Sequence, residues 1–199
     1  MNPEASLSDY NYKGQPLSSF SDSKLLDLVN HGHEGAFAEL YHRYSSDIFN
    51  YSLRLVSRPS VAEDLLQEIY VAVWQSAGTF RGKSSFKTWL FRIAHNKSMS
   101  WLRSFYRTQE LEFDESIIPD EGINPDTQSV LNWRAEMVQQ ALNELSPNHR
   151  AVIELFYFTG LSYQQISKVV GCPIGTVKSR MSHAIQHLNR ILLNYGLET

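Results

Sequence analysis

The 199-residue sequence has a single cysteine, Cys172, and no apolar run that approaches the length of a membrane span. One cysteine cannot form a disulfide within the chain, so we expect the protein to work in a reducing compartment. A spanning helix needs about 20 consecutive apolar residues. Residues 1–20 also lack the charged start and apolar centre of a signal peptide. The sequence therefore predicts a cytoplasmic protein with no membrane insertion.

The sequence also contains no recognisable catalytic or cofactor-binding motif. No glycine-rich phosphate loop follows a strand, and no nucleophile has a recognisable base partner along the chain. His31 and His33 have no cysteine or acidic partner at ligand spacing nearby, so we interpret them as turn histidines rather than half of a zinc site. We therefore expect no enzymatic activity, no cofactor and no metal.

Acidic residues are missing from two long windows. The formal net charge of −3 argues against nucleic-acid affinity of the chain as a whole. However, no Asp or Glu occurs in residues 69–109 or 155–197, and both windows contain lysine and arginine. Each window could therefore approach phosphates without self-repulsion.

Apolar residues recur at three- and four-residue spacing through most of the chain, which predicts an all-α fold. Ser60 and Glu63 have the spacing of a capping box at the start of one helix, and Thr127 could cap another after the linker. We expect two helical domains joined by an acidic flexible linker. The expected boundaries are a flexible tail at 1–21, a first domain at 22–106, the linker at 107–127 and a second domain at 128–199.

Residues 161–193 have the pattern of a helix-turn-helix. Ser162 and Gln165 predict a capping box at the first helix, and Gly171 to Pro173 end that helix. The second helix, from about Ile174, leaves polar side chains exposed that suit the DNA major groove. They are Thr176, Lys178, Ser179, Arg180, Ser182, His183 and Gln186. The alternative is a helical hairpin whose polar face is merely solvated.

Cations and aromatic residues are interleaved between residues 77 and 103. Such a mixture is used on single-stranded nucleic acid, where cations follow the backbone and rings stack on unpaired bases. The candidates are Thr79, Phe80, Arg81, Lys83, Ser84, Ser85, Lys87, Trp89, Arg92 and Asn96. Aromatic residues at helical spacing are more often core, so we expect Trp89 to be buried and Phe80 to lie nearer a ligand.

Residues 110–126 carry acidic side chains and no lysine or arginine, together with Pro119, Gly122 and Pro125. Like-charge repulsion would extend this linker. It is either a solvated spacer or an acidic strand that sits in a basic channel of a partner.

Three stretches together resemble one family, the extracytoplasmic-function (ECF) group of bacterial sigma factors. They are AEDLLQEIYVAVW at 62–74, FRGKSSFKTWLFRIAHN at 80–96, and ALNELSPNHRAVIELFYFTGLSYQQISKVVGCPIGTVKSRMSHAIQHL at 141–188. The resemblance implies a sigma region 2-like domain followed by a sigma region 4-like domain. It implies promoter recognition, promoter melting and transcription initiation. The implied partners are core RNA polymerase, double-stranded and melted promoter DNA, and an anti-sigma protein.

The resemblance also assigns roles to residues. The implied polymerase-binding residues are Asp64, Gln67, Glu68, Val71 and Trp74. The basic aromatic stretch would capture a flipped base of the minus-ten element, and the acidic linker would thread toward the RNA path of the polymerase.

For the minus-thirty-five element, Lys178, Ser179 and Ser182 would meet base edges, whereas Thr176, Arg180 and His183 would meet phosphates. Many relatives carry arginine at the His183 position, which puts the phosphate contact there in doubt.

Two other classes of protein compete with a sigma factor. One is a helix-turn-helix transcriptional regulator whose amino-terminal domain senses a signal or dimerises, and it would need a self-complementary interface. The other is a DNA-processing enzyme such as a site-specific recombinase, for which Ser84, Ser85 and Arg81 are the only nearby candidates.

Overall fold

The structure is a computed structural model that describes residues 16–108 and 140–194. The predicted acidic linker, except for its first two residues, and the predicted Thr127 cap lie outside this range. In the amino-terminal part a short 3₁₀ turn, Leu17–Ser19, precedes four α-helices. These are α1 (Asp22–Asn30), α2 (Glu34–Val56), α3 (Pro59–Ser76) and α4 (Phe86–Thr108), with a second 3₁₀ turn (Ala77–Thr79) after α3.

The carboxyl-terminal part is also helical. It contains α6 (Pro147–Ile153), a π-helical turn (Glu154–Phe158), α7 (Tyr163–Val170) and α8 (Ile174–Asn194). We call residues 16–108 the amino-terminal module and residues 140–194 the carboxyl-terminal module. The predicted all-α class with two helical modules is confirmed for the described residues.

Local signals explain where several helices begin. The Ser21 hydroxyl accepts a hydrogen bond from the backbone N–H of Lys24 at the start of α1. The Ser162–Gln165 capping box is complete at the start of α7. The backbone N–H of Gln165 donates to the Ser162 hydroxyl, and the backbone N–H of Ser162 donates to the side-chain oxygen of Gln165. Gly171 then ends α7 with a φ of 70°, a left-handed conformation that glycine adopts without steric cost. The predicted helix-turn-helix therefore forms as its sequence signals indicate.

The expected capping box at Ser60 and Glu63 is wrong. Helix α3 begins two residues earlier, at Pro59 instead of Val61, and its N-cap is Arg58, without a side-chain capping bond. Proline suits the first helical position because its missing N–H would have had no partner there. At α2, the ring of His33 accepts from the backbone N–H of Ala36, which gives this histidine a capping role.

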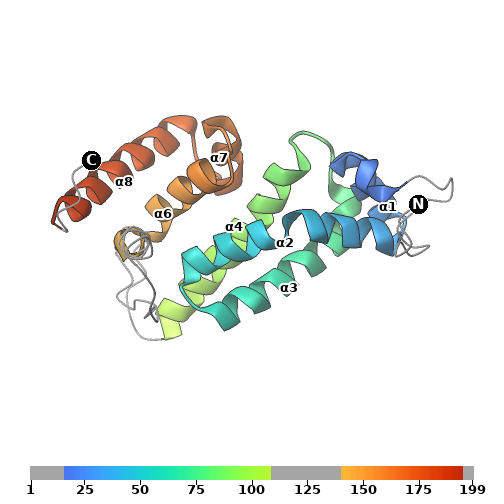
Figure 1. Cartoon of the computed structure of the whole chain (residues 1–199), viewed down its shortest axis with the longest axis horizontal. Helices are drawn as coiled ribbons and strands as arrows, with labels where there is room; N and C mark the ends of the chain where they lie inside the picture. The colour runs from blue at the N-terminus through green and yellow to red at the C-terminus, as the bar shows by residue number, and fades with distance from the viewer. Residues whose placement is uncertain (1–15, 109–139, 195–199) are drawn as a thin grey trace.

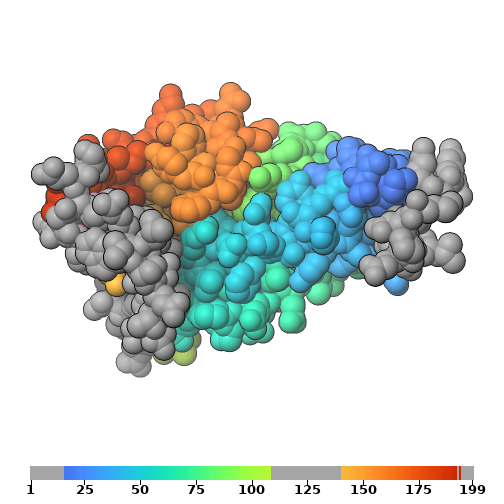
Figure 2. All heavy atoms as spheres, viewed as in Figure 1, coloured from blue at the N-terminus to red at the C-terminus, as the bar shows by residue number. Residues whose placement is uncertain are grey.

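Helices α2, α3 and α4 pack against one another, and α1 covers one end of α2 (Figure 1). The carboxyl-terminal module rests on this bundle, because α7 packs against α4 and α6 contacts α2. Figure 2 shows the α6–α7 part, in orange, directly against α2 and α4. One cluster of buried apolar residues runs through both modules, from Leu17 to Ala184. In the described part of the chain, no helix combines the length and apolar character that crossing a bilayer requires.

Candidate nucleic-acid and partner interfaces

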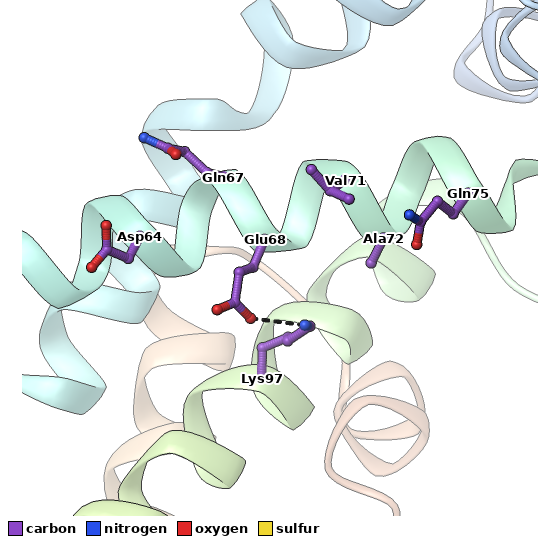
Figure 3. Close-up of a pocket in the computed structure, with 7 residues that line it drawn as sticks. All are labelled: Asp64, Gln67, Glu68, Val71, Ala72, Gln75 and Lys97. Carbon is purple, nitrogen blue, oxygen red and sulfur yellow. Dashed lines mark hydrogen bonds and ion pairs between the residues drawn. The ribbon is translucent and has the colours of Figure 1, made fainter.

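The side chains of Asp64, Gln67, Glu68 and Val71 line up along one exposed face of α3 (Figure 3). They border a shallow depression of about 460 Å³, and Ala72, Gln75 and Lys97 complete its lining. Val71 is 54% exposed, and Trp74 on the same helix is 39% exposed. The arrangement offers an apolar centre with acidic and amide groups around it, which suits a protein partner.

Lys97 reaches this face from α4. Its ammonium forms an ion pair with Glu68 at 2.8 Å, so the charge of Glu68 is partly neutralised in the free chain (Figure 3). Sequence reasoning missed Lys97, because only the packing of α4 on α3 brings it there. Trp74 is 39% exposed and stands edge-on to Phe37, with ring centroids 5.2 Å apart, outside the lining of the depression.

The loop between α3 and α4 is held by short local bonds. The Thr79 hydroxyl donates to the carbonyl oxygen of Ser76 at 2.7 Å. Gly82 has a φ of 65°, a turn that a residue with a Cβ would strain. Arg81 and Lys83 are exposed on either side of Gly82, and Ser84 is half-buried. The loop therefore presents two cations from a defined backbone.

Phe80 and Trp89 lie against each other at the base of this loop. Their ring centroids are 5.4 Å apart in an edge-to-face arrangement, and Phe86 lies 6.0 Å from Trp89. Phe80 and Trp89 are both half-buried, whereas Phe86 is buried. Trp89 therefore packs against the core, as expected, from a half-buried position beside the loop.

Ser85 has a structural role at the start of α4. Its hydroxyl accepts from the backbone N–H of Thr88 at 3.2 Å and shares a hydrogen bond with the Thr88 hydroxyl at 2.8 Å. Arg92 and Asn96 are exposed on later turns of α4. Lys87 is half-buried, since its ammonium donates to the carbonyl oxygen of Thr159 in the carboxyl-terminal module at 2.7 Å.

A buried pair that sequence reasoning missed lies under this surface. The Tyr51 hydroxyl and the Nδ1 atom of His95 share a hydrogen bond of 2.9 Å. Burial, with smaller contributions from Arg180 and Arg103, lowers the pKa of His95 to about 4. Burial also raises the pKa of Tyr51, so both rings are neutral near pH 7. The pair joins α2 to α4 without a buried charge.

Helix α8 presents the predicted polar front. Its exposed members are Lys178, Ser179, Ser182, His183 and Gln186, whereas Thr176 and Arg180 are half-buried. The Ser179 hydroxyl donates to the carbonyl oxygen of Thr176 at 3.0 Å. On the opposite side of α8, Val177, Met181 and Ala184 are buried, so the helix is anchored along one stripe.

His183 lies beside a second histidine. Its ring is edge-to-face with that of His149 on α6, with centroids 6.1 Å apart. Burial lowers the pKa of His149, and His183, Arg180 and His187 lower it further. This part of α8 is therefore electropositive as well as polar.

Three further charged residues that sequence reasoning missed lie where the modules meet. Glu154 is 0% exposed and Arg150 is 1% exposed. An Nη1 atom of Arg54, on α2, lies 2.9 Å from Glu154 Oε2. No local pattern marks these residues, since Arg54 and Glu154 are separated by 100 positions.

Comparison with known families agrees with this arrangement. The family model "Sigma-70 region 2" matches residues 40–108, and "Sigma-70, region 4" matches residues 135–188. The first match covers α4 and most of the α2–α3 pair, and the second covers the helix-turn-helix.

Curated relatives match over most of their length. The RNA polymerase sigma-H factor of Pseudomonas aeruginosa is 31% identical over 88% of this chain and 96% of its own. The ECF RNA polymerase sigma-E factor of Haemophilus influenzae is 30% identical, covering 82% of this chain and 91% of the relative. The ECF RNA polymerase sigma factor SigX of Bacillus subtilis is 30% identical, covering 79% of this chain and 84% of the relative.

Solved structures share the fold. The sigma factor RpoE of Bartonella quintana, in complex with the anti-sigma factor NepR, superposes with a TM-score of 0.65 at 31% identity, covering 78% of this chain and 96% of that one. CnrH, in complex with the cytosolic domain of CnrY, gives a TM-score of 0.65 at 23% identity, covering 86% and 96%, and shows the fold.

The chain belongs to the sigma-70 family of RNA polymerase sigma factors, and within it to the ECF group. It is an alternative sigma factor, a DNA-binding protein that directs RNA polymerase to promoters for transcription initiation. The two competing classes, a conventional regulator and a recombinase, are not favoured by these matches.

Proposed function

We propose that the surfaces described above divide promoter recognition and polymerase binding among them. The α3 face of Asp64, Gln67, Glu68 and Val71, with Trp74 beside it, binds core RNA polymerase. The observation that carries this assignment is the depression on α3, where the exposed Val71 stands among acidic and amide side chains. Exposed apolar surface rimmed by polar groups, here Val71 with the neighbouring Trp74, is typical of a protein-binding site.

The loop at 79–85 and the exposed side of α4 bind the melted minus-ten element. Arg81, Lys83 and Arg92 provide exposed cations for the backbone, and the Phe80–Trp89 pair offers aromatic surface for a flipped base. Extruding a base costs on the order of a few kcal/mol, which a preformed pocket offsets. Ser85 contributes by fixing the start of α4 rather than by reading a base.

The front of α8 binds the minus-thirty-five element in the major groove. Lys178, Ser179 and Ser182 are exposed and stand at the amino-terminal end of the helix, where recognition helices contact base edges. Thr176, Arg180 and His183 lie beside them and suit phosphate contacts. Gln186 extends the same exposed face by one further turn.

The protein works in the cytoplasm and leaves the chemistry of RNA synthesis to the polymerase. An anti-sigma protein is a further partner under this proposal. It is supported by the Bartonella quintana relative, whose structure is a complex with the anti-sigma factor NepR.

Run-off transcription with purified chain and sigma-free core polymerase tests these assignments. On a pool of promoter fragments, the intact chain is expected to produce discrete transcripts. A variant with Asp64→Ala, Gln67→Ala and Glu68→Ala is expected to lose most of them, because the α3 face no longer binds the polymerase.

A matched control replaces two exposed acidic residues and one exposed amide residue elsewhere, Asp27→Ala, Asn30→Ala and Glu34→Ala. It is expected to leave transcription near that of the unmodified chain. Equal loss in both variants, or retained transcription in the α3 variant, would contradict the assignment of this face.

A further inference from the structure

A short segment that we call the strap, residues 17–22, lies against α2 near the start of the described chain. Leu17 is only 2% exposed, and Phe20 packs against the core. The strap precedes residues 40–108, which match the region 2 family model, so that match assigns no role to it. The contacts of the strap lead toward the surface proposed for the minus-ten element.

Arg43 on α2 holds the strap through its guanidinium. Its Nη1 atom donates to the carbonyl oxygen of Phe20 and to Asp22 Oδ1, both at 2.9 Å. Its Nη2 atom donates to the carbonyl oxygen of Ser18 at 2.9 Å. The Nε atom donates to Oε1 of Glu39, on the same helix, at 2.7 Å. A planar guanidinium with its donors engaged in this way fixes the strap on α2 in one position.

Asp22 connects the strap to Tyr44, the next residue of α2. The Tyr44 hydroxyl donates to Asp22 Oδ2. Burial raises the pKa of Tyr44, and the hydrogen bond to Asp22 raises it further, so the hydroxyl keeps its proton. Both oxygens of the Asp22 carboxylate are therefore bonded, one to Arg43 and the other to Tyr44. The carboxylate thereby fixes the outer end of the Tyr44 ring.

The Tyr44 ring supports the start of α4. It lies edge-to-face against the ring of Phe86, the first residue of α4, with centroids 5.5 Å apart. Phe86 is buried, and its centroid lies 6.0 Å from that of Trp89, one turn further along. The Trp89 ring in turn contacts Phe80, with centroids 5.4 Å apart. A continuous line of contacts therefore joins the strap to the aromatic pair proposed to receive a flipped base.

The other end of the loop at 79–85 is tied to the same support. The 3₁₀ turn Ala77–Thr79, which leads into the loop, packs against α1, and α1 begins at Asp22. The loop is therefore bounded by α1 before it and by Phe86 after it. A binding site whose walls are fixed in advance loses less freedom when its ligand arrives, and it binds more tightly for that reason.

We propose that Arg43 and Tyr44 are positioning residues for the minus-ten surface, acting through the strap and Phe86 to hold the Phe80–Trp89 pair ready for an unpaired base. This inference rests on the proposed role of that pair in binding melted DNA. Arg43 and Tyr44 do not touch DNA themselves, since both are half-buried and their donors are engaged within the module. Their loss therefore weakens binding of the melted strand and leaves polymerase binding intact.

Binding of the melted strand by the holoenzyme tests the proposal. The probe is a single-stranded oligonucleotide with the non-template minus-ten sequence of a promoter found by run-off transcription. Arg43→Met, which releases the strap, is expected to weaken this binding about tenfold, and Tyr44→Phe, which removes only the bond to Asp22, about threefold. Affinity for core polymerase is expected to stay the same in both variants.

Two control variants match these changes. Tyr41→Phe removes the hydroxyl of an exposed tyrosine one turn earlier on α2, and Lys24→Met removes an exposed cation of α1. Both are expected to leave binding of the melted strand unchanged. Circular dichroism checks that each variant keeps its helices. Tyr44→Phe removes a single oxygen atom, so it carries the test if Arg43→Met lowers the helical content.

Fluorescence of Trp89 provides a readout that needs neither DNA nor polymerase. The other three tryptophans are replaced by phenylalanine, at Trp74, Trp101 and Trp133. In this background, acrylamide quenching of the free chain reports how accessible Trp89 is. Arg43→Met is expected to increase the quenching, because Phe86 no longer has a fixed ring behind it.

Three results would each overturn the proposal. They are unchanged binding of the melted strand by both variants, an equal loss of affinity for core polymerase, and unchanged quenching of Trp89. If the unmodified holoenzyme does not bind the melted strand, the proposed minus-ten role fails instead. The quenching measurement still shows in that case whether the strap positions Trp89.

Discussion

The ammonium of Lys168 lies 3.2 Å from the backbone carbonyl oxygen of Lys83, so the helix-turn-helix contacts the loop proposed to meet melted DNA. The sequence around either residue does not predict this contact, because 85 positions separate Lys83 from Lys168. The contact shows that α7 and the loop at 79–85, although far apart in sequence, are adjacent in the structure.

Replacing the exposed Lys83 with alanine is expected to weaken promoter binding by the holoenzyme in a salt-dependent way. A lysine that contacts one phosphate contributes about one unit to the slope of log affinity against log salt. Titration of promoter DNA at several salt concentrations measures this slope. Lys24→Ala, which removes an exposed lysine on α1, is expected to leave the slope unchanged. A slope for Lys83→Ala equal to that of the unmodified protein would exclude a phosphate contact at this position.

Replacing His183 with arginine is expected to strengthen binding to the minus-thirty-five element. The side chain is exposed on α8, and a permanent charge there would steepen the salt slope by about one unit. Asn189→Arg adds the same charge further along the helix and is expected to have a smaller effect. The measurement is promoter affinity of the holoenzyme as a function of salt. Identical effects of the two variants would point to general electrostatic attraction instead.

His95 is expected to make the fold sensitive to mild acid. The unfolded chain takes up a proton near pH 6.5, whereas folded His95 does so only near pH 4. The stability that neutral His95 contributes is therefore fully present above pH 6.5, and it is lost as the pH falls from 6.5 toward 4. Between pH 7 and pH 5 the loss amounts to about 2 kcal/mol.

Urea unfolding of the wild type and of His95→Gln at both pH values measures this contribution. Glutamine does not titrate, so the difference in unfolding free energy between the two proteins should shrink by about 2 kcal/mol at pH 5. A difference that stays constant with pH would mean that His95 is protonated equally easily in both states.

Gly171 and Gly175 are expected to respond oppositely to alanine. Gly171 has a φ of 70° and no atom near the added Cβ, so Gly171→Ala costs about 1 kcal/mol through backbone strain alone. Gly175 is in the first turn of α8 with equally open space, and alanine there should stabilise by up to about 1 kcal/mol. Thermal unfolding of both variants measures whether each substitution stabilises or destabilises the fold. Destabilisation by both would show that the turn tolerates no added methyl group.

Features governed by local chemistry were predictable from the sequence. The Ser162–Gln165 capping box, the glycine at 171 and the apolar stripe of α8 are determined by residues within a few positions of one another, and the structure confirms them. At α3 two local start signals compete. Pro59 takes the first helical position, so Ser60 lies inside the helix and cannot act as its cap.

Features that depend on packing were not predictable. Lys97 meets Glu68 only because α4 lies beside α3, and Arg54 meets Glu154 only because the modules close on each other. The π-helical turn at Glu154–Phe158 likewise carries no signal in residue spacing. Buried charge of this kind looks, in a sequence, like an ordinary solvated helix face.

The uninterrupted cluster of buried residues from Leu17 to Ala184 also determines how the chain melts. Two bundles that share apolar surface are expected to unfold together, since exposing the core of either removes contacts from the other. Each module alone would have a smaller core, and smaller cores bury a lower fraction of their surface. The contact between the modules thus gives the chain a shared core larger than either module has by itself.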